Sequence, residues 1–312
     1  MGDSPEVIAG VEAVDCTGKQ VLVTGSTSGI GRAAALAFGR LGADVLVHGR
    51  DTTAGEAVVD ELDAIGATAE FVAADFADFA AVRSLAAAVR ERTDELDILV
   101  NNAGGLFRDG RLTDAGIEYT FHVNHLAPFL LTTELLAHLA EGARIVTTAS
   151  AAHRGASLDL DRVETVDSYS GTWAYSHSKL ANILFTAELG YRLDTSDRAV
   201  TANCIHPGAI PGSGFFRFLP GPLSQLAAVL DVVPGVTSVA DGAAELLFVA
   251  LSPRVADVSG RYFAGQSTGT PSTAARDADA ARRLWAYSAE TFDIPEPLAD
   301  GGDPTSDEPD CT

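Results

Sequence analysis

Lysine is the residue that this 312-residue chain most nearly lacks. Only Lys19 and Lys179 are present, and arginine supplies the rest of the 21 basic side chains, against 43 acidic ones. The formal net charge is therefore -22. Because so negative a surface repels phosphate backbones and anionic lipid headgroups, we expect neither nucleic acid nor a membrane as a partner.

The acid excess itself has two interpretations. A halophilic protein carries an acidic surface because high salt screens the self-repulsion. A high-GC genome would also favour Arg, Asp and Ala codons, but codon bias does not explain so large an excess of acids. We therefore favour adaptation to high salt.

Cysteine is also scarce, and no long hydrophobic run occurs. Cys16, Cys204 and Cys311 are scattered and form no CxxC pair, which predicts neither a zinc site nor a disulfide framework. No uncharged apolar run has the length that a bilayer requires, and residues 1–13 lack the basic-then-apolar order of a signal peptide. We expect a cytoplasmic protein without a metal.

Short apolar runs alternate with helical stretches along most of the chain. Strands that are apolar throughout, separated by helices, predict a parallel sheet that is covered on both faces. We expect an α/β, single-domain, Rossmann-type doubly wound sheet over residues 18–294, with a solvated N-terminal extension (1–17) and an acidic, disordered tail (295–312). Strands are predicted at 20–24, 43–48, 69–74, 96–101, 144–149, 200–206 and 261–263, and helices at 31–41, 54–65, 79–92, 116–140, 173–193 and 239–250.

Two segments depart from this alternation. The long helix predicted over 116–140 contains Pro128, which would bend it. The segment 210–235 is rich in Gly, Pro and Phe, and it follows the sixth strand. It is either an ordinary surface loop or a substrate lid, and its position favours the lid.

A glycine turn joins the first strand to the first helix of the sheet. In a dinucleotide site, Gly25 would permit the turn, Gly29 would let the cofactor approach the backbone, and Gly31 would allow close helix–strand packing. Ser28 and Ile30 lie in the same turn, and we expect them to contact the cofactor. A tight turn can need its glycines for structure alone, but the position after the first strand favours a nucleotide.

The end of the second strand bears on the choice between NAD and NADP. Gly49 stands where a ribose-binding acid would be, and Arg50 follows it. An arginine can pair with a 2′-phosphate that an acid would repel, so we favour NADP(H) over NAD(H). Asp51 weakens this preference unless it lies beyond the strand, and Arg50 could also be a solvated charge.

Two further strand ends carry candidate cofactor contacts. Asp75 and Phe76 follow the third strand, where Asp75 either accepts from the adenine amino group or caps the next helix. Asn102, Ala103 and Gly104 follow the fourth strand, where small residues would let the backbone approach the cofactor.

Tyr175 and Lys179 lie four residues apart and therefore on one face of a helix. A tyrosine ionises near pH 10, but a neighbouring ammonium, together with an oxidised nicotinamide, would lower its pKa and let it act as a base. Such pairs also occur by chance on exposed helix surfaces.

Two more polar residues support a catalytic role for Tyr175 and Lys179. Ser150 follows the fifth strand, where its hydroxyl could hold a substrate oxygen or cap a turn. Asn124 lies inside the predicted long helix, where it would disturb regular hydrogen bonding and hold a relay water, or pack as a buried amide.

This combination closely resembles the short-chain dehydrogenase/reductase family over residues 19–294. It is most similar to the retinol-dehydrogenase-like branch in FHVNHLAPFLLT (121–132), AYSHSKLANILFT (174–186) and HPG (206–208). The resemblance implies a catalytic tetrad of Asn124, Ser150, Tyr175 and Lys179, with Tyr175 and Lys179 also contacting the cofactor. It further implies that Pro207, Gly208 and Ile210 flank the nicotinamide. Gly212 stands where the family usually has Thr or Ser, so Ser213 would have to make the contact with the nicotinamide carboxamide.

The sequence thus predicts an NADP(H)-dependent oxidoreductase that interconverts an alcohol and a carbonyl compound by hydride transfer, with Tyr175 as acid and base. The alternatives are a reductase of C=C bonds in enones and a redox sensor that binds NADP without turnover. The expected partner is a small-molecule substrate, and relatives suggest a homodimer or homotetramer.

Overall fold

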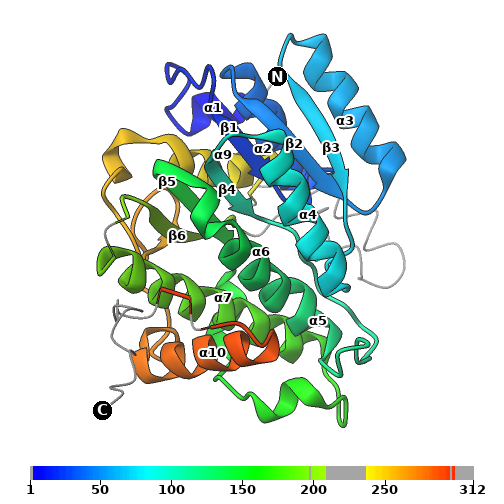
Figure 1. Cartoon of the computed structure of the whole chain (residues 1–312). Helices are drawn as coiled ribbons and strands as arrows, with labels where there is room; N and C mark the ends of the chain where they lie inside the picture. Colours follow the sequence, from blue (N-terminus) through cyan, green and yellow to red (C-terminus); the bar gives the residue numbers. More distant parts are fainter. Residues whose placement is uncertain (1–2, 197, 209–236, 296, 299–312) are drawn as a thin grey trace, which may run out of the picture.

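Seven parallel strands form one sheet, in the order β3-β2-β1-β4-β5-β6-β7 (Figure 1). The computed structural model describes residues 3–196, 198–208, 237–295 and 297–298. The strands are β1 (Gln20–Val23), β2 (Asp44–Gly49), β3 (Ala69–Ala73), β4 (Leu96–Asn101), β5 (Leu139–Thr148), β6 (Thr201–His206) and β7 (Tyr262–Ala264). The predicted parallel sheet is confirmed, because every pair of neighbouring strands is parallel.

Helices cover both faces of the sheet (Figure 1). One buried cluster packs the sheet against α2 (Gly29–Arg40), α3 (Thr52–Ala64) and α9 (Val239–Leu251). The other packs it against α4 (Phe79–Arg92), α6 (Ala127–Leu135), α7 (Gly171–Asp194) and α10 (Ala278–Thr291). Two separate cores on the two faces of one sheet define the predicted doubly wound arrangement.

The order of the strands creates the crevice that positions the site. The central strand β1 pairs with β2 on one side and with β4 on the other. The chain therefore leaves β1 and β4 toward opposite faces, and the loops after them separate at the carboxyl ends. In doubly wound sheets, ligands bind at this switch point.

The predicted long helix over 116–140 is wrong. The segment is broken into α5 (Tyr119–Phe121), a π-helix (His122–Leu126), α6 and a 3₁₀ turn (Leu136–His138). Pro128 lies in the first turn of α6, directly after the π-helix, where it has no N–H to donate to the preceding turn. The last residues already belong to β5, since Leu139 pairs with Leu96, and a short apolar run does not distinguish a strand from a helix by its periodicity.

The N-terminal residues are not the solvated extension that the sequence predicts. A short helix, α1 (Pro5–Ile8), packs against α9, and Ala9, Val11 and Cys16 are buried. Arg40 of α2 holds Glu6 in a bidentate ion pair, with its Nε 2.6 Å from Oε1. Residues beyond position 298, in the predicted disordered tail, lie outside the described part of the chain.

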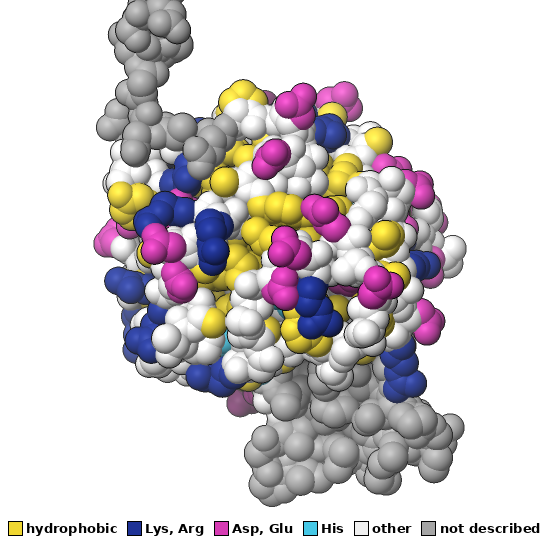
Figure 2. Space-filling model, turned by 90° about the horizontal axis from the view of Figure 1, so that it is seen from below, with side chains coloured by type: hydrophobic (Ala, Val, Ile, Leu, Met, Phe, Trp, Pro, Cys, Tyr) yellow, Lys and Arg dark blue, Asp and Glu magenta, His cyan; other side chains and the backbone are white. Residues whose placement is uncertain are grey.

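Charged side chains of both signs are scattered over the lower face of the molecule. Figure 2 shows acidic and basic side chains interspersed there around a central group of hydrophobic ones. The acid excess is therefore not gathered into one patch on this side. Within the described residues, no helix has the length and apolar character that spanning a bilayer requires.

The last helix, α10, lies along α7 (Figure 1). Trp285 and Leu284 of α10 are fully buried in the core that contains α7, and Trp285 stacks on Phe185 with ring centroids 5.9 Å apart. Helix α7 is consequently buried on most of its surface within a single copy of the chain. The expected homodimer or homotetramer stays a prediction.

Candidate active site

A cavity of about 720 Å³ opens at the carboxyl ends of the strands. Every predicted site residue lines it except Asn124, which lies behind it, and Ile210, which is outside the described residues together with Gly212, Ser213 and the predicted lid. The lining consists of Gly25, Thr27, Ser28, Gly29, Ile30, Gly31, His48, Gly49, Arg50, Ala74, Asp75, Phe76, Asn102, Ala103, Gly104, Gly105, Leu106, Phe107, Val123, Thr148, Ala149, Ser150, Ala151, Ala152, Tyr175, Lys179, His206, Pro207 and Gly208. One cavity thus unites the predicted cofactor and catalytic ends.

The glycine turn has the close contacts that its sequence predicts. Gly25 has a φ of +66°, and a Cβ there would lie 2.8 Å from Cα of Ala103. A Cβ on Gly31 would lie 2.4 Å from the carbonyl oxygen of Gly25. Ser28 is the N-cap of α2, yet its side chain makes no capping hydrogen bond. The N-terminus of α2 therefore faces the cavity with N–H groups suited to an anion.

The loop after β4 is fastened to this turn by Thr24, which the sequence did not single out. Its buried hydroxyl accepts from the N–H groups of Asn102 (2.9 Å) and Ala103 (3.0 Å) and donates to the carbonyl of Val100. The Asn102 amide in turn donates to the carbonyls of Thr24 (3.0 Å) and Gly25 (3.3 Å). These bonds fix the small residues of the loop beside the turn.

Arg50 and Asp51, the two residues after β2, have different roles. The Asp51 carboxylate accepts from the N–H of Ala54 and caps α3, so it lies beyond the strand as the NADP interpretation requires. Arg50 lines the cavity with a side chain that is 61% exposed. A Cβ on Gly49 would lie 2.4 Å from Cγ2 of Thr27, so the strand end leaves no room for an acidic side chain unless Thr27 moves.

Asp75 and Phe76 line the same end of the cavity. The alternative role of Asp75 as a helix cap is wrong, because Asp78 is the N-cap of α4. Asp75 instead accepts from the N–H of Ala77 in a local turn, and its Oδ2 lies 3.8 Å from Nη1 of Arg50.

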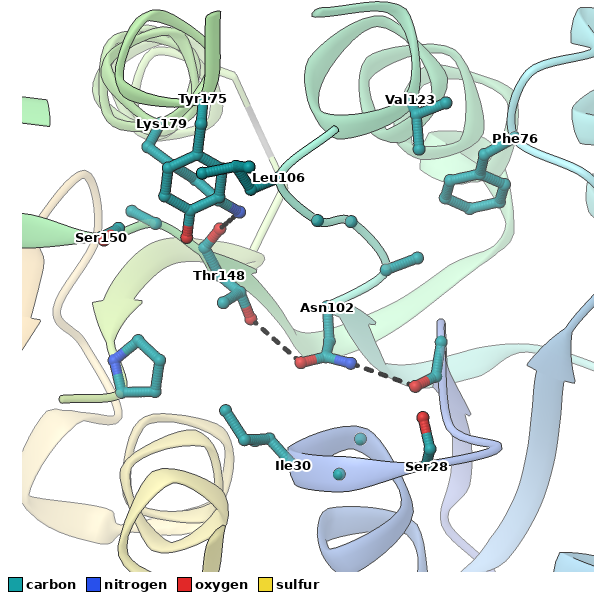
Figure 3. A pocket seen from close by; sticks show the side chains of 18 of the residues that line it. Ser28, Ile30, Phe76, Asn102, Leu106, Val123, Thr148, Ser150, Tyr175 and Lys179 are labelled. Atoms are coloured by element: carbon teal, nitrogen blue, oxygen red, sulfur yellow. Dashed lines mark hydrogen bonds between the residues drawn. The ribbon is translucent and has the colours of Figure 1, made fainter. Parts of the chain in front are cut away.

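Tyr175 and Ser150 meet at the other end of the cavity (Figure 3). The Ser150 hydroxyl lies near the phenol and accepts from the N–H of Ala152. Burial raises the pKa of the Tyr175 phenol, while the nearby Ser150 hydroxyl opposes this rise. Burial is the largest cause of the shift, and the expectation that Lys179 together with an oxidised nicotinamide lowers this pKa stays a prediction.

Lys179 lies behind the tyrosine ring, with Nζ 5.7 Å from the ring centroid (Figure 3). Its Nζ donates to the carbonyl of Thr148 at 2.8 Å, and Asn182 donates to the same oxygen at 3.2 Å. Burial lowers the pKa of Lys179 to about 8. The ammonium is thus buried without a carboxylate among its hydrogen-bond partners in the described structure.

Asn124 interrupts the regular helix as its sequence context predicts, since it lies within the π-helix. Its amide is fully used by protein groups: Oδ1 accepts from the N–H of Gly105, while Nδ2 donates to the Gly105 carbonyl and to the Ser178 hydroxyl, each at 2.9 Å. A Cβ on Gly104 would lie 2.7 Å from Oδ1 of Asn124. Asn124 therefore ties the loop after β4 to α7, which carries Tyr175.

The chain is similar in sequence to proteins of one known family. The family model of the short chain dehydrogenases matches residues 19–216, more than half of the chain. Retinol dehydrogenase 13 of Homo sapiens is 36% identical over 295 residues, which cover 90% of this chain and 86% of that protein. The chain belongs to the short-chain dehydrogenase family and is an oxidoreductase similar to the retinol dehydrogenase branch.

Two solved structures with bound NADP share the fold. A short chain dehydrogenase from Burkholderia cenocepacia is 30% identical, with a TM-score of 0.64 over 84% of this chain and 99% of that one. The angucycline C-6 ketoreductase LanV is 27% identical, with a TM-score of 0.63 over 81% of this chain and 95% of that one. Among the described residues, no group of His, Cys, Asp and Glu side chains could hold a metal ion.

Proposed function

We propose that the protein interconverts a carbonyl compound and an alcohol with NADP(H), and that Tyr175 transfers the proton. The observation that carries this proposal is that Tyr175 and Ser150 lie together at one end of the same cavity that the glycine turn lines. A general acid must lie within hydrogen-bonding reach of the atom that it protonates, and these two hydroxyls define a place for a substrate oxygen.

The residues of the cavity fit a nicotinamide dinucleotide. Gly25 and Gly31 allow the tight packing of the turn, since a Cβ on either would clash with backbone atoms of Ala103 or Gly25, and the uncapped N-terminus of α2 offers N–H groups to a pyrophosphate. Ile30, the segment 102–104, Pro207 and Gly208 would enclose the rest of the molecule. When bound, the cofactor supplies or accepts the hydride.

Gly49 and Arg50 support NADP as the preferred form. An acid that would bind the ribose 2′-hydroxyl clashes with Thr27, and the exposed guanidinium of Arg50 lies at the cavity edge. Its ion pair with Asp75 spans 3.8 Å between exposed groups, so it is weak and a phosphate can replace it. The two NADP-bound relatives are in line with this preference.

Tyr175 is suited to donate a proton, which favours carbonyl reduction as the main direction. Burial raises its pKa, so the phenol is protonated at neutral pH and can give its proton to the oxygen that becomes the alcohol. Ser150 would hold this oxygen. In the oxidative direction the same phenol would have to lose its proton first.

Lys179 and Asn124 complete the proposed tetrad. The Lys179 ammonium would stabilise negative charge that develops on the Tyr175 oxygen and would bind the ribose of the nicotinamide. The Asn124 side chain is occupied, so a relay water would bind its backbone carbonyl, to which Pro128 has no N–H to donate. This water relay stays a prediction.

The substrate end of the cavity suggests a carbonyl compound with an apolar body. Leu106 and Phe107 line the cavity beside Tyr175, and no charged side chain besides Lys179 belongs to this part of the described lining. The retinol dehydrogenase and ketoreductase relatives are named for apolar or aromatic substrates, which supports this class.

Turnover of a substrate panel tests the proposal. The protein is incubated with NADPH or NADH and with aldehydes, ketones and enones in molar KCl, and cofactor oxidation is followed by absorbance. We expect ketones or aldehydes to be reduced and NADPH to be preferred. Turnover of enones alone would identify a C=C reductase, and tight NADPH binding without any turnover would identify a redox sensor.

Tyr175→Phe tests the assigned proton donor. General acid catalysis contributes roughly 10²–10⁴-fold, so we expect kcat to fall by about that factor while the Kd for NADPH stays within twofold. Tyr287→Phe is the matched control, because its hydroxyl binds Glu164 and does not line the cavity. Full activity of Tyr175→Phe would contradict the assignment.

A further inference from the structure

The glycine turn is held by a hydrogen bond to a histidine, His48 of β2. The Gly25 N–H donates to Nδ1 of His48 at 3.2 Å. On the same ring, Nε2 lies 3.2 Å from the carbonyl oxygen of Ala74, at the end of β3. One imidazole therefore connects the carboxyl ends of three adjacent strands, β1, β2 and β3.

These two bonds determine the protonation state of the ring. The Ala74 carbonyl can only accept, so Nε2 carries the hydrogen, and the Gly25 N–H can only donate, so Nδ1 has a free lone pair. The imidazole is neutral, with its proton on Nε2. Burial favours this state, since the side chain is 2% exposed and its pKa is lowered to about 4.

The ring is also part of the wall of the cavity. It lines the cavity together with Gly25, Ala74 and Phe76, and it stacks on Phe76 with ring centroids 4.7 Å apart and an interplanar angle of 29°. Because Nδ1 accepts from the Gly25 N–H, that amide is not available to a ligand. The anion-binding N–H groups must then come from later in the turn and from the start of α2.

The opposite side of the turn leaves it no room to move. Ala103 lies where a Cβ of Gly25 would be, and Asn102 holds the Gly25 carbonyl. The backbone of Gly25 is thus bonded at its N–H by His48 and at its carbonyl by Asn102. Removing the first bond would free the peptide at which the turn begins.

We propose that His48 is a positioning residue for the cofactor: its neutral imidazole sets the place of the Gly25 peptide and of the Phe76 ring, and so determines cofactor affinity. This inference rests on the proposed function, because it assumes that the cavity binds a nicotinamide dinucleotide. His48 does not act on the reacting atoms, since it lies at the β1–β3 end of the cavity, whereas Ser150 and Tyr175 come from the end of β5 and from α7.

Two substitutions separate positioning from mere packing. His48→Leu removes both hydrogen bonds while keeping an apolar side chain in the core. His48→Asn keeps an acceptor at the place of Nδ1 and can restore the bond from the Gly25 N–H. The Kd for NADPH is measured by fluorescence titration, kcat and both KM values by steady-state kinetics, and stability by urea unfolding without cofactor.

We expect His48→Leu to raise the Kd and the KM for NADPH by about tenfold, which is the effect of one lost, well-placed hydrogen bond. The kcat at saturating NADPH and the KM of the carbonyl substrate should stay within twofold. His48→Asn should recover most of the affinity. The control His125→Leu removes a buried imidazole bonded to Ser288, outside the cavity lining, and should lower stability without changing the Kd.

The inference would be overturned if His48→Leu lowered the urea midpoint but left the Kd of the folded protein unchanged. It would also be overturned if kcat fell as much as the affinity, or if His48→Asn bound NADPH no better than His48→Leu. Failure of the wild-type protein to bind either dinucleotide would instead refute the proposed function. The two failures are therefore distinguishable.

Discussion

Replacing Lys179 by methionine should make the protein more stable while abolishing its activity. Methionine has a similar length and carries no charge to desolvate. Burial lowers the Lys179 pKa from 10.5 to about 8, which corresponds to about 3 kcal/mol of unfavourable free energy for the charged form in the folded state. The variant loses the hydrogen bond from Lys179 to the Thr148 carbonyl, which removes about 1 kcal/mol of this gain in stability. The loss is no larger because Asn182 still donates to that oxygen.

The size of this effect changes with pH in a defined window. Below pH 8 the lysine is charged in both the folded and the unfolded chain, so the wild-type protein bears the full cost. Between pH 8 and 10.5 only the unfolded chain retains the proton, and the stability of the wild type rises relative to the variant. We expect Lys179→Met to be about 2 kcal/mol more stable at pH 7 and about equal to the wild type at pH 9.5.

Urea unfolding at both pH values, followed by circular dichroism, measures this difference. Lys19→Met is the matched control, because Lys19 is exposed and its pKa is raised by its hydrogen bond to Asp97. That substitution should slightly destabilise the protein at both pH values. A Lys179→Met variant that is less stable than the wild type at pH 7, or a difference that does not change with pH, would refute the reasoning.

Three further outcomes follow from the charges of the molecule. Arg50→Asp should lower the ratio of kcat/KM for NADPH over NADH by roughly 10–100-fold, and an unchanged ratio would remove Arg50 from cofactor selection. Molar KCl should raise the urea midpoint relative to dilute buffer; a lower midpoint in KCl would contradict adaptation to salt. Lowering the pH from 7.5 to 5.5 should cost about 1 kcal/mol of stability for each histidine that burial keeps neutral, because the unfolded chain binds protons below pH 6.5 while the folded chain does so only near pH 4 or below. Substituting one of them should remove its share of this pH dependence; they are His48, His122, His125 and His177.

The sheet and the glycine turn could be predicted because local chemistry determines them. Apolar runs bounded by turn residues marked all seven strands, and Gly25 and Gly31 stand where no Cβ fits. The break in the segment 116–140 was harder to predict from the sequence. The change from helix to strand at Leu139 depends on its pairing with Leu96, which lies 43 positions earlier in the chain.

The electrostatics of the site could not be predicted from spacing alone. The interval between Tyr175 and Lys179 places both on one helix face, but only the folded structure shows that desolvation dominates both pKa values. Thr24 and His48 were missed for a related reason. Each is an ordinary residue in a strand or at its end, and its role arises from groups brought close by neighbouring strands.

Because the chain has only two lysines, chemical labelling of Lys179 can measure whether the cavity is occupied. Acylating reagents attack the neutral amine, and near pH 8.5 a large share of Lys179 is neutral, whereas Asp97 keeps Lys19 charged. Mass spectrometry of the labelled peptides would therefore compare the extent of labelling of Lys179, in the cavity wall, with that of Lys19, on the surface. Protection of the first by an added dinucleotide would reveal occupancy before any substrate has been found.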